Sequence, residues 1–230
     1  DVNFKLFPGE TLGLVGESGC GKSTLAKAIL QLESLEEGTI LYEGIDIKKL
    51  KGKALKKFRK EVQLVFQDPF ASLNPSIRIG KAIMEPMRVH KMYATQKQRK
   101  EKTLELLQKV GLESIHFDRY PHEFSGGQRQ RINIARALAL EPKIIVCDES
   151  VSALDISVQA QILNLLNDLK DQFGFAYLFI SHDLSVVRYM SDHLMVMKQG
   201  RMIEHGEADS VFSNPKNNYT QQLLAAIPSV

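Results

Sequence analysis

Short apolar segments of strand length alternate with segments of helical periodicity along most of this 230-residue chain. The strand-like segments are rich in Val, Ile and Leu and lie at 11–15, 38–44, 61–67, 143–148 and 176–180. A hairpin is predicted over 193–204, and apolar residues at helical spacing predict helices near 22–32, 98–110, 128–139 and 158–169. Because strands that alternate with helices form βαβ units, the pattern predicts an α/β fold with a mostly parallel sheet.

The middle of the chain differs in pattern from both ends. Between residues 68 and 142 it has proline-punctuated loops and helical periodicity, without a strand-like segment. We therefore predict a helical subdomain at 68–142, inserted into a core formed by 1–67 and 143–230. The first 45 residues are rich in strand-like patterns, which predicts an antiparallel β portion at the N-terminal end of this core.

Composition and charge narrow the functional class only slightly. The chain is 43% hydrophobic, enough for a substantial core, and no apolar run approaches the ~18–20 residues of a membrane span. A net charge of +3 is too small to indicate nucleic-acid binding. The basic segment 48–60 is interpreted as a solvated connector, although contact with anionic lipid or an acidic partner would also explain it. Cys20 and Cys147 lie in different segments, so we expect two unpaired thiols in a reducing compartment.

One segment between a predicted strand and a predicted helix carries the clearest chemistry. It fits the pattern G-x-x-x-x-G-K-[ST] and reads Gly16-Glu17-Ser18-Gly19-Cys20-Gly21-Lys22-Ser23-Thr24. The glycines let backbone N–H groups converge on phosphate oxygens, and the helix directs its positive dipole end toward them. Lys22 is expected to reach the terminal phosphates and Ser23 to place its hydroxyl on Mg²⁺. A glycine-rich turn without a ligand leaves the complete pattern unexplained, so we predict that the chain binds a nucleoside triphosphate.

The strand-like segment at 143–148 ends in an acid, Asp148, and a second acid, Glu149, follows directly. Downstream of a phosphate loop, the first acid, Asp148, is expected to support the metal. The second, Glu149, is expected to orient or deprotonate the attacking water.

A second candidate loop precedes the predicted helix at 128–139 and reads Ser125-Gly126-Gly127-Gln128. Uncovered N–H groups at a helix start can bind an anion, whereas the alternative is an ordinary N-cap by Ser125. Two phosphate-recognising loops in one chain are explained most simply if the second serves the nucleotide of a neighbouring subunit.

These motifs, taken in order, resemble the full set of an ABC-type ATPase. The matching segments are the Walker A loop at 16–24, the Q-loop residue Gln67, the signature at 124–128, the Walker B strand at 144–149, the D-loop at 152–155 and the switch histidine His182. The match spans nearly the whole chain.

The resemblance implies a role for each of these residues. The Walker A residues would bind ATP, and Ser23, Gln67 and Asp148 would hold Mg²⁺ or its water. Glu149 would be the catalytic base, with His182 and Gln67 completing the catalytic set. The signature residues Ser125, Gly126, Gly127 and Gln128 would bind ATP held by the opposing subunit, with Asp155 at the contact between subunits.

A finer resemblance connects the chain to the ATPase subunits of oligopeptide, dipeptide and nickel importers. It rests on the segments 67–75, 125–139 and 214–224. It implies ATP-driven import of oligopeptides or dipeptides, with nickel-chelate or glutathione import as the alternatives. A non-transport ABC ATPase and an exporter cassette are more distant alternatives.

The same resemblance implies the partners and the location. The expected partners are a second ATPase subunit, homologous or identical, two membrane permease subunits and, indirectly, a solute-binding protein. No nucleic acid is expected. The expected location is the cytoplasmic face of the cell membrane, as a peripheral subunit.

The sequence departs from the family pattern in two places. Ser150 follows Glu149 where the family usually has Pro, and because the acid itself is present we expect activity to be retained. The family's adenine-stacking aromatic lies further upstream of the Walker A loop than this sequence reaches. We therefore expect the 230 residues to bind ATP weakly by themselves, and a chain with the upstream residues to bind it more tightly.

Overall fold

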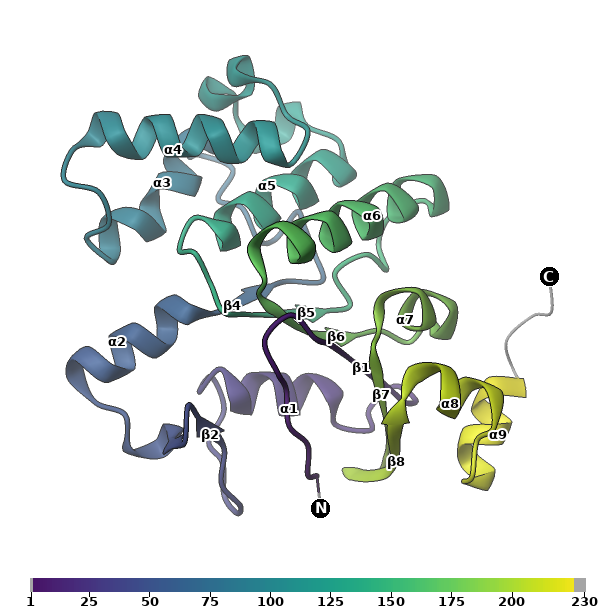
Figure 1. Ribbon diagram of the computed structural model, residues 1–230. Helices are drawn as coiled ribbons and strands as arrows, with labels where there is room; N and C mark the ends of the chain where they lie inside the picture. Colours follow the sequence, from purple (N-terminus) through teal and green to yellow (C-terminus); the bar gives the residue numbers. More distant parts are fainter. Residues whose placement is uncertain (1, 226–230) are drawn as a thin grey trace.

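A sheet with the strand order β4-β5-β6-β1-β7-β8 forms the centre of the computed structural model, which describes residues 2–225 (Figure 1). Its strands are β1 (Thr11–Val15), β4 (Val62–Val65), β5 (Ile144–Asp148), β6 (Ala176–Ile180), β7 (His193–Lys198) and β8 (Arg201–Glu207). Neighbouring strands from β4 to β7 run parallel, and only β8 pairs in the antiparallel sense. The prediction of a mostly parallel sheet is therefore confirmed.

The alternation of side chains along each strand divides the core between the two faces of the sheet. In β6, Tyr177 and Phe179 join the cluster on one face, and Leu178 and Ile180 join the cluster on the other. All four are at most 1% exposed, so the strand is buried on both sides, as its continuous apolar run predicts. Each such burial contributes roughly 1.5–3 kcal/mol.

Helices cover both faces. The helices α5 (Gly126–Leu138), α6 (Ile156–Phe173) and α7 (Leu184–Met190) supply buried residues to the first cluster. On the opposite face, α1 (Lys22–Ile29) and α2 (Gly52–Glu61) contribute Ala26 and Phe58 to the second cluster. Figure 1 shows α5 and α6 above the sheet and α1 below it.

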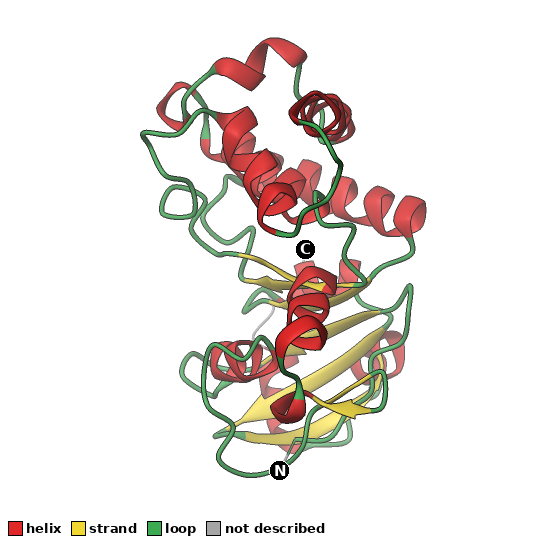
Figure 2. Cartoon of the chain, turned by 90° about the vertical axis from the view of Figure 1, so that its left-hand side faces the viewer, coloured by secondary structure: helices red, strands yellow, loops and turns green. Residues whose placement is uncertain are grey.

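A group of helices lies further from the sheet, in the upper part of Figure 2. It contains α3 (Ile79–Val89), α4 (Gln96–Lys109) and the short 3-10 helices η2 (Ser114–Asp118) and η3 (Pro121–Glu123). These elements pack on one another and on α5 through buried apolar residues such as Ile83 and Leu107. Gly80 allows close packing here, because a Cβ at this position would lie 2.4 Å from the ring of Phe117.

The structure departs from the predicted pattern at the N-terminal β portion. The strand expected at 38–44 is reduced to β2 (Leu41–Tyr42), which pairs antiparallel with β3 (Ile45–Asp46) in a separate small sheet. Leu41 and Ile45 are mostly exposed, so the apolar pattern at 38–44 does not indicate a strand buried in the main sheet. An antiparallel pair is present, as expected, but it is short.

Some helices were not predicted from the sequence. The basic segment interpreted as a connector forms the 3-10 helix η1 (Ile47–Lys49) and helix α2, which buries Phe58 and exposes most of its lysines. After β8 the chain forms α8 (Ala208–Ser213) and α9 (Asn218–Ala225). Within residues 2–225, no helix combines the length and apolar character needed to cross a bilayer.

Candidate functional site

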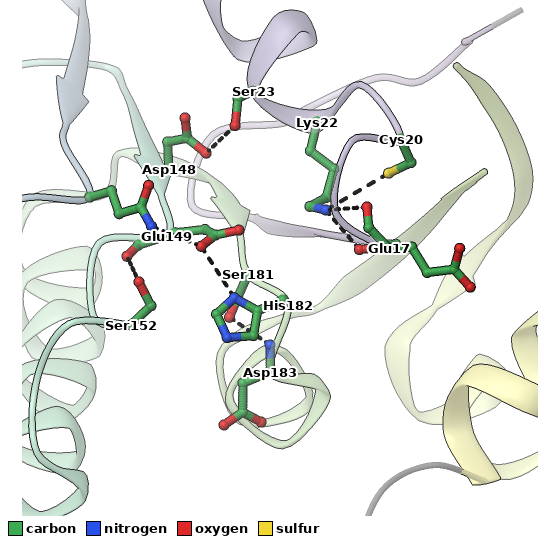
Figure 3. Close-up of polar contacts among 12 residues, drawn as sticks. Glu17, Cys20, Lys22, Ser23, Asp148, Glu149, Ser152, Ser181, His182 and Asp183 are labelled. Atoms are coloured by element: carbon green, nitrogen blue, oxygen red, sulfur yellow. Dashed lines mark hydrogen bonds and ion pairs between the residues drawn. The ribbon is translucent and has the colours of Figure 1, made fainter. Parts of the chain in front are cut away.

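Three adjacent strands end at the same edge of the sheet, and the candidate site is built on the segments that follow them. Strand β1 leads into the loop at 16–21, β5 is followed by Glu149, and β6 is followed by Ser181 and His182. Since β6 lies between β5 and β1, the three segments meet although they are far apart in sequence (Figure 3). Ligands of open α/β sheets bind at this edge.

The loop between β1 and α1 forms a cradle of backbone groups around a buried lysine. Gly21 has a φ of 105°, which favours glycine, and no side chain caps the helix that follows. The Nζ of Lys22 donates to the carbonyl oxygens of Gly16 at 2.7 Å and Glu17 at 3.0 Å. Lys22 is only 6% exposed, so its positive charge is concentrated inside the loop. A buried cation beside uncapped N–H groups suits an anionic ligand.

The hairpin of β7 and β8 holds the loop from outside. The backbone N–H of Gly200 donates to the carbonyl oxygen of Cys20 at 2.9 Å. A Cβ at Gly16 would lie 2.2 Å from the carbonyl oxygen of Met197, so this position accepts only glycine. The path of the loop is therefore fixed by an element that lies about 180 residues away in sequence.

Asp148, at the end of β5, faces the start of α1. The hydroxyl of Ser23 donates to Asp148 Oδ1 at 3.1 Å (Figure 3). Burial raises the pKa of Asp148, and the hydrogen bond from Ser23 opposes that rise. The structure thus brings together two of the residues that the sequence predicts for magnesium.

The next residue, Glu149, is surrounded by the other predicted catalytic groups. Its Oε2 accepts a hydrogen bond from Gln67 Nε2 at 3.1 Å. The same oxygen lies 3.2 Å from His182 Nδ1 (Figure 3). The backbone of Glu149 has a φ of 49°, which is uncommon for a residue with a side chain. Its N–H donates to the carbonyl oxygen of Ile180, and this bond helps to hold a conformation that costs about 1–3 kcal/mol.

The glycine-rich segment at the start of α5 is capped by Ser125. The hydroxyl of Ser125 accepts from the N–H of Gln128, and the side chain of Gln128 accepts from the N–H of Ser125. This reciprocal pair is a capping box. Gly127 has a packing reason to be glycine, because a Cβ there would lie 2.4 Å from Cγ1 of Val158 in α6. The capping box and the close packing of Gly127 on Val158 thus both stabilise the first turn of α5 through contacts inside this chain.

The predicted residues of the second loop do not join the cluster around Glu149. Within residues 2–225, no hydrogen bond connects the segment 125–128 to the phosphate loop. Gly126 lies next to Phe70 and Leu154 instead. Asp155 is exposed and precedes Ile156, whose side chain is 86% exposed. Ser125 and Asp155 are therefore exposed, whereas Gly127 is buried against α6.

Two contacts at the site have no counterpart in the sequence predictions. Ser152 donates its hydroxyl to the carbonyl oxygen of Glu149 at 2.9 Å, and a serine in a turn after a strand is a weak signal for such a bond. Gln130 is fully buried in α5, and its amide donates to the carbonyl oxygen of Ser150 at 2.6 Å. Nothing in the sequence marks Gln130, because a buried polar residue is recognised only after the helix faces are known.

The oxygen ligands that the sequence predicts for magnesium are of a kind that suits this ion. Mg²⁺ is usually held by one or two carboxylates, waters and substrate phosphates rather than by a full protein cage. The hydroxyl of Ser23, the carboxylate of Asp148 and the amide oxygen of Gln67 belong to this class of ligand. Within residues 2–225, no cluster of three or more His, Cys, Asp or Glu residues could hold an ion by itself. Such a set fits a metal that arrives with a nucleotide.

Comparisons with known proteins agree with this geometry. A family model described as ABC transporter matches residues 1–152. The oligopeptide transport ATP-binding protein OppF of Streptococcus mutans is 52% identical, over 99% of this chain and 74% of that protein. The dipeptide transport ATP-binding protein DppF of Escherichia coli is 50% identical, over 99% of this chain and 68% of that protein. The glutathione import ATP-binding protein GsiA of Pectobacterium atrosepticum is 53% identical over 99% of this chain, which spans 36% of that relative.

Solved structures share the fold over almost the whole chain. The protein cbiO1 from Clostridium perfringens, part of the ABC transporter complex cbiONQ, has a TM-score of 0.83 and 27% identity, over 99% of this chain and 88% of that one. The ATP-binding cassette MJ0796, solved as a dimer bound to ADP and Pi, has a TM-score of 0.79 and 30% identity, over 90% and 89% of the two chains.

Proposed function

This chain belongs to the ABC transporter family, and we propose that it is the ATP-binding and ATP-hydrolysing subunit of an importer of oligopeptides or dipeptides. The observation that carries the ATPase assignment is the contact of Glu149 with both Gln67 and His182, beside a phosphate loop that buries Lys22. The peptide cargo rests on about 50% identity to relatives named for peptide transport, over nearly the whole chain.

Each residue of the site has its own role in the transfer of the γ-phosphate of ATP to water. The backbone N–H groups at 16–24 and the ammonium of Lys22 bind and orient the phosphates of ATP. Glu149, held by Gln67 and His182, accepts the proton of a water aligned with the γ-phosphate, and His182 contacts that phosphate. The hydrogen bond from the Glu149 N–H to the carbonyl oxygen of Ile180 holds the backbone, so the carboxylate is already oriented before the substrate binds.

Ser23, Asp148 and Gln67 are the residues that would hold Mg²⁺, directly or through water. The ion would neutralise charge on the β- and γ-phosphates. The hydrogen bond from Ser23 keeps the Asp148 carboxylate turned toward the phosphate loop.

The second loop has no hydrogen bond to the chain's own phosphate loop within the described residues, which supports a site shared between two subunits. We propose that Ser125, Gly126, Gly127 and Gln128 bind the nucleotide of an opposing ATPase subunit and that Asp155 lies at the contact. Their separation from the chain's own phosphate loop and the exposed Ile156 beside Asp155 support this arrangement. A related cassette has been solved as a dimer with ADP and Pi.

The remaining organisation follows from this role. The residues 68–142 would act as the helical subdomain that carries the signature, inserted into the nucleotide-binding core at 1–67 and 143–230. Two membrane permeases, with a solute-binding protein outside, would be the partners, and the subunit would lie on the cytoplasmic face of the membrane. Glutathione import is the second candidate, favoured by 53% identity to GsiA.

The ATPase assignment is tested by Glu149→Gln, which removes the proton acceptor and keeps the shape. We expect hydrolysis to fall by about 100-fold or more while ATP still binds. Glu101→Gln, on the exposed face of α4, is the matched control and should leave the rate unchanged. A Glu149→Gln protein with nearly normal turnover would exclude Glu149 as the base.

A further inference from the structure

The phosphate loop touches helix α9 near the C-terminal end of the described chain. The phenol oxygen of Tyr219 accepts a hydrogen bond from the backbone N–H of Glu17 at 3.2 Å, although 202 positions separate the two residues. Tyr219 is 7% exposed, so the contact is shielded from water. Neither the fold nor the proposed chemistry accounts for this contact.

The contact acts on the peptide unit that also holds Lys22. The N–H of Glu17 and the carbonyl of Gly16 belong to one planar group, so fixing one side fixes the other. That carbonyl oxygen accepts from Lys22 Nζ at 2.7 Å. Tyr219 and Lys22 thus bind the two polar groups of one peptide unit, Tyr219 the N–H from outside the loop and Lys22 the carbonyl oxygen from inside.

Tyr219 is itself held firmly in place. The Nζ of Lys198, at the end of β7, lies 4.3 Å from the centre of its ring, a cation–π distance. The N–H of Tyr219 donates to Asn217 Oδ1, and the N–H of Asn217 donates to Glu204 Oε2 in β8. Burial raises the pKa of Tyr219, so the phenol stays neutral at ordinary pH.

We propose that Tyr219 is a positioning residue for nucleotide binding, which sets the orientation of the Gly16–Glu17 peptide and through it the place of the Lys22 ammonium. This inference rests on the proposed function, because it assigns the phosphate loop to ATP. Lys22 holds phosphates both before and during phosphoryl transfer. A misplaced peptide therefore weakens binding of the ground state and the transition state alike, which raises KM and leaves kcat nearly constant.

The test compares two tyrosine-to-phenylalanine substitutions in the full-length protein, assembled with its partners. Tyr219→Phe removes the hydrogen-bond acceptor and keeps the ring that contacts Lys198. Tyr93→Phe is the matched control, because its hydroxyl bonds Glu141 at 2.9 Å in another part of the chain. The readouts are KM and kcat for MgATP, and the hydrogen-exchange rate of the Glu17 amide without nucleotide.

We expect Tyr219→Phe to raise KM about three- to tenfold, the range for losing one buried hydrogen bond, with kcat changed less than about twofold. The Glu17 amide should exchange faster in this variant alone. An unchanged KM, an equal rise in Tyr93→Phe, or a loss confined to kcat would each overturn the inference. A wild-type protein that fails to bind ATP would overturn the proposed function as well, whereas normal wild-type binding with an unaffected Tyr219→Phe overturns the inference alone.

Discussion

Glu149 combines the three residue-scale properties expected of a positioned base. Its carboxylate contacts a neutral amide and an imidazole, its backbone adopts a φ of 49°, and its carbonyl is held by Ser152. Strained backbone at a residue with chemistry is typical of active sites. The strand that ends in Asp148 and Glu149 was predictable from its apolar run, whereas the left-handed turn was not, because glutamate carries no signal for positive φ.

The two cysteines differ in a way that makes thiol labelling informative. Cys147 is fully buried in β5, and burial raises its pKa to about 12, so it should stay unlabelled in the native protein. Cys20 is 6% exposed in the phosphate loop, with its sulfur 3.8 Å from Lys22 Nζ. We expect alkylation of Cys20 to be slow and to block ATP binding.

ATP should also protect Cys20, because the nucleotide occupies the same loop. At an ATP concentration ten times its Kd, the labelling rate measured by mass spectrometry should fall about tenfold. Cys147 serves as the internal control for unfolding. Equal rates with and without nucleotide would count against a phosphate-binding role for the loop.

At the scale of elements, the sequence predicted best where one segment has one clear periodicity. The strands at 11–15 and 176–180 and the hairpin turning near residue 200 agree with β1, β6 and β7–β8. The sequence predicted least where tertiary contacts decide the structure. The segment of helix α2 was interpreted as a connector because its helix buries a single large apolar residue, Phe58, among many lysines. Helix α9 is held in place by contacts with β8 and with the phosphate loop.

The same contrast, between residues found from local patterns and residues placed by tertiary contacts, holds for the candidate site. The residues at 16–24, Asp148 and Glu149 were found from patterns along the chain, and the parallel sheet explains why they meet. Gln130 and Tyr219 were missed as contributors to the site, and Ser152 was noted only as part of the segment 152–155 and not for its bond to Glu149. Each acts through a single hydrogen bond to a backbone group, which leaves no spacing pattern in the sequence.

The packing of α5 on α6 gives a prediction at the scale of elements. Gly127→Ala would place a Cβ 2.4 Å from Val158 Cγ1, so the two helices must move apart. We expect a loss of about 1–3 kcal/mol in the free energy of unfolding, measured by denaturant titration. Gly126→Ala is the matched control, because its Cβ would have ordinary contacts, the nearest being Leu154 at 3.4 Å.

The double variant Gly127→Ala/Val158→Ala removes the clashing methyl group and should regain part of the lost stability. If Gly126→Ala and Gly127→Ala destabilise the protein equally, the close approach of Val158 is not the reason for glycine at 127.

At the scale of the whole molecule, we propose that the chain carries two half-sites. The phosphate loop, Asp148 and Glu149 form one half at the edge of the sheet, and the capped start of α5 forms the other. In this proposal, each ATP is bound by the phosphate loop of one subunit and by the segment 125–128 of another. The proposed importer supplies that second subunit.

The measurement that tests this account most directly is affinity purification of the full-length protein from detergent-solubilised native membranes, with identification of the proteins that accompany it. We predict a second ATPase subunit, two multi-span permeases and a peptide-binding protein, retained more strongly when Glu149→Gln prevents hydrolysis. Recovery only in the soluble fraction, with ribosomes or DNA, would contradict the importer while leaving the ATPase chemistry in place.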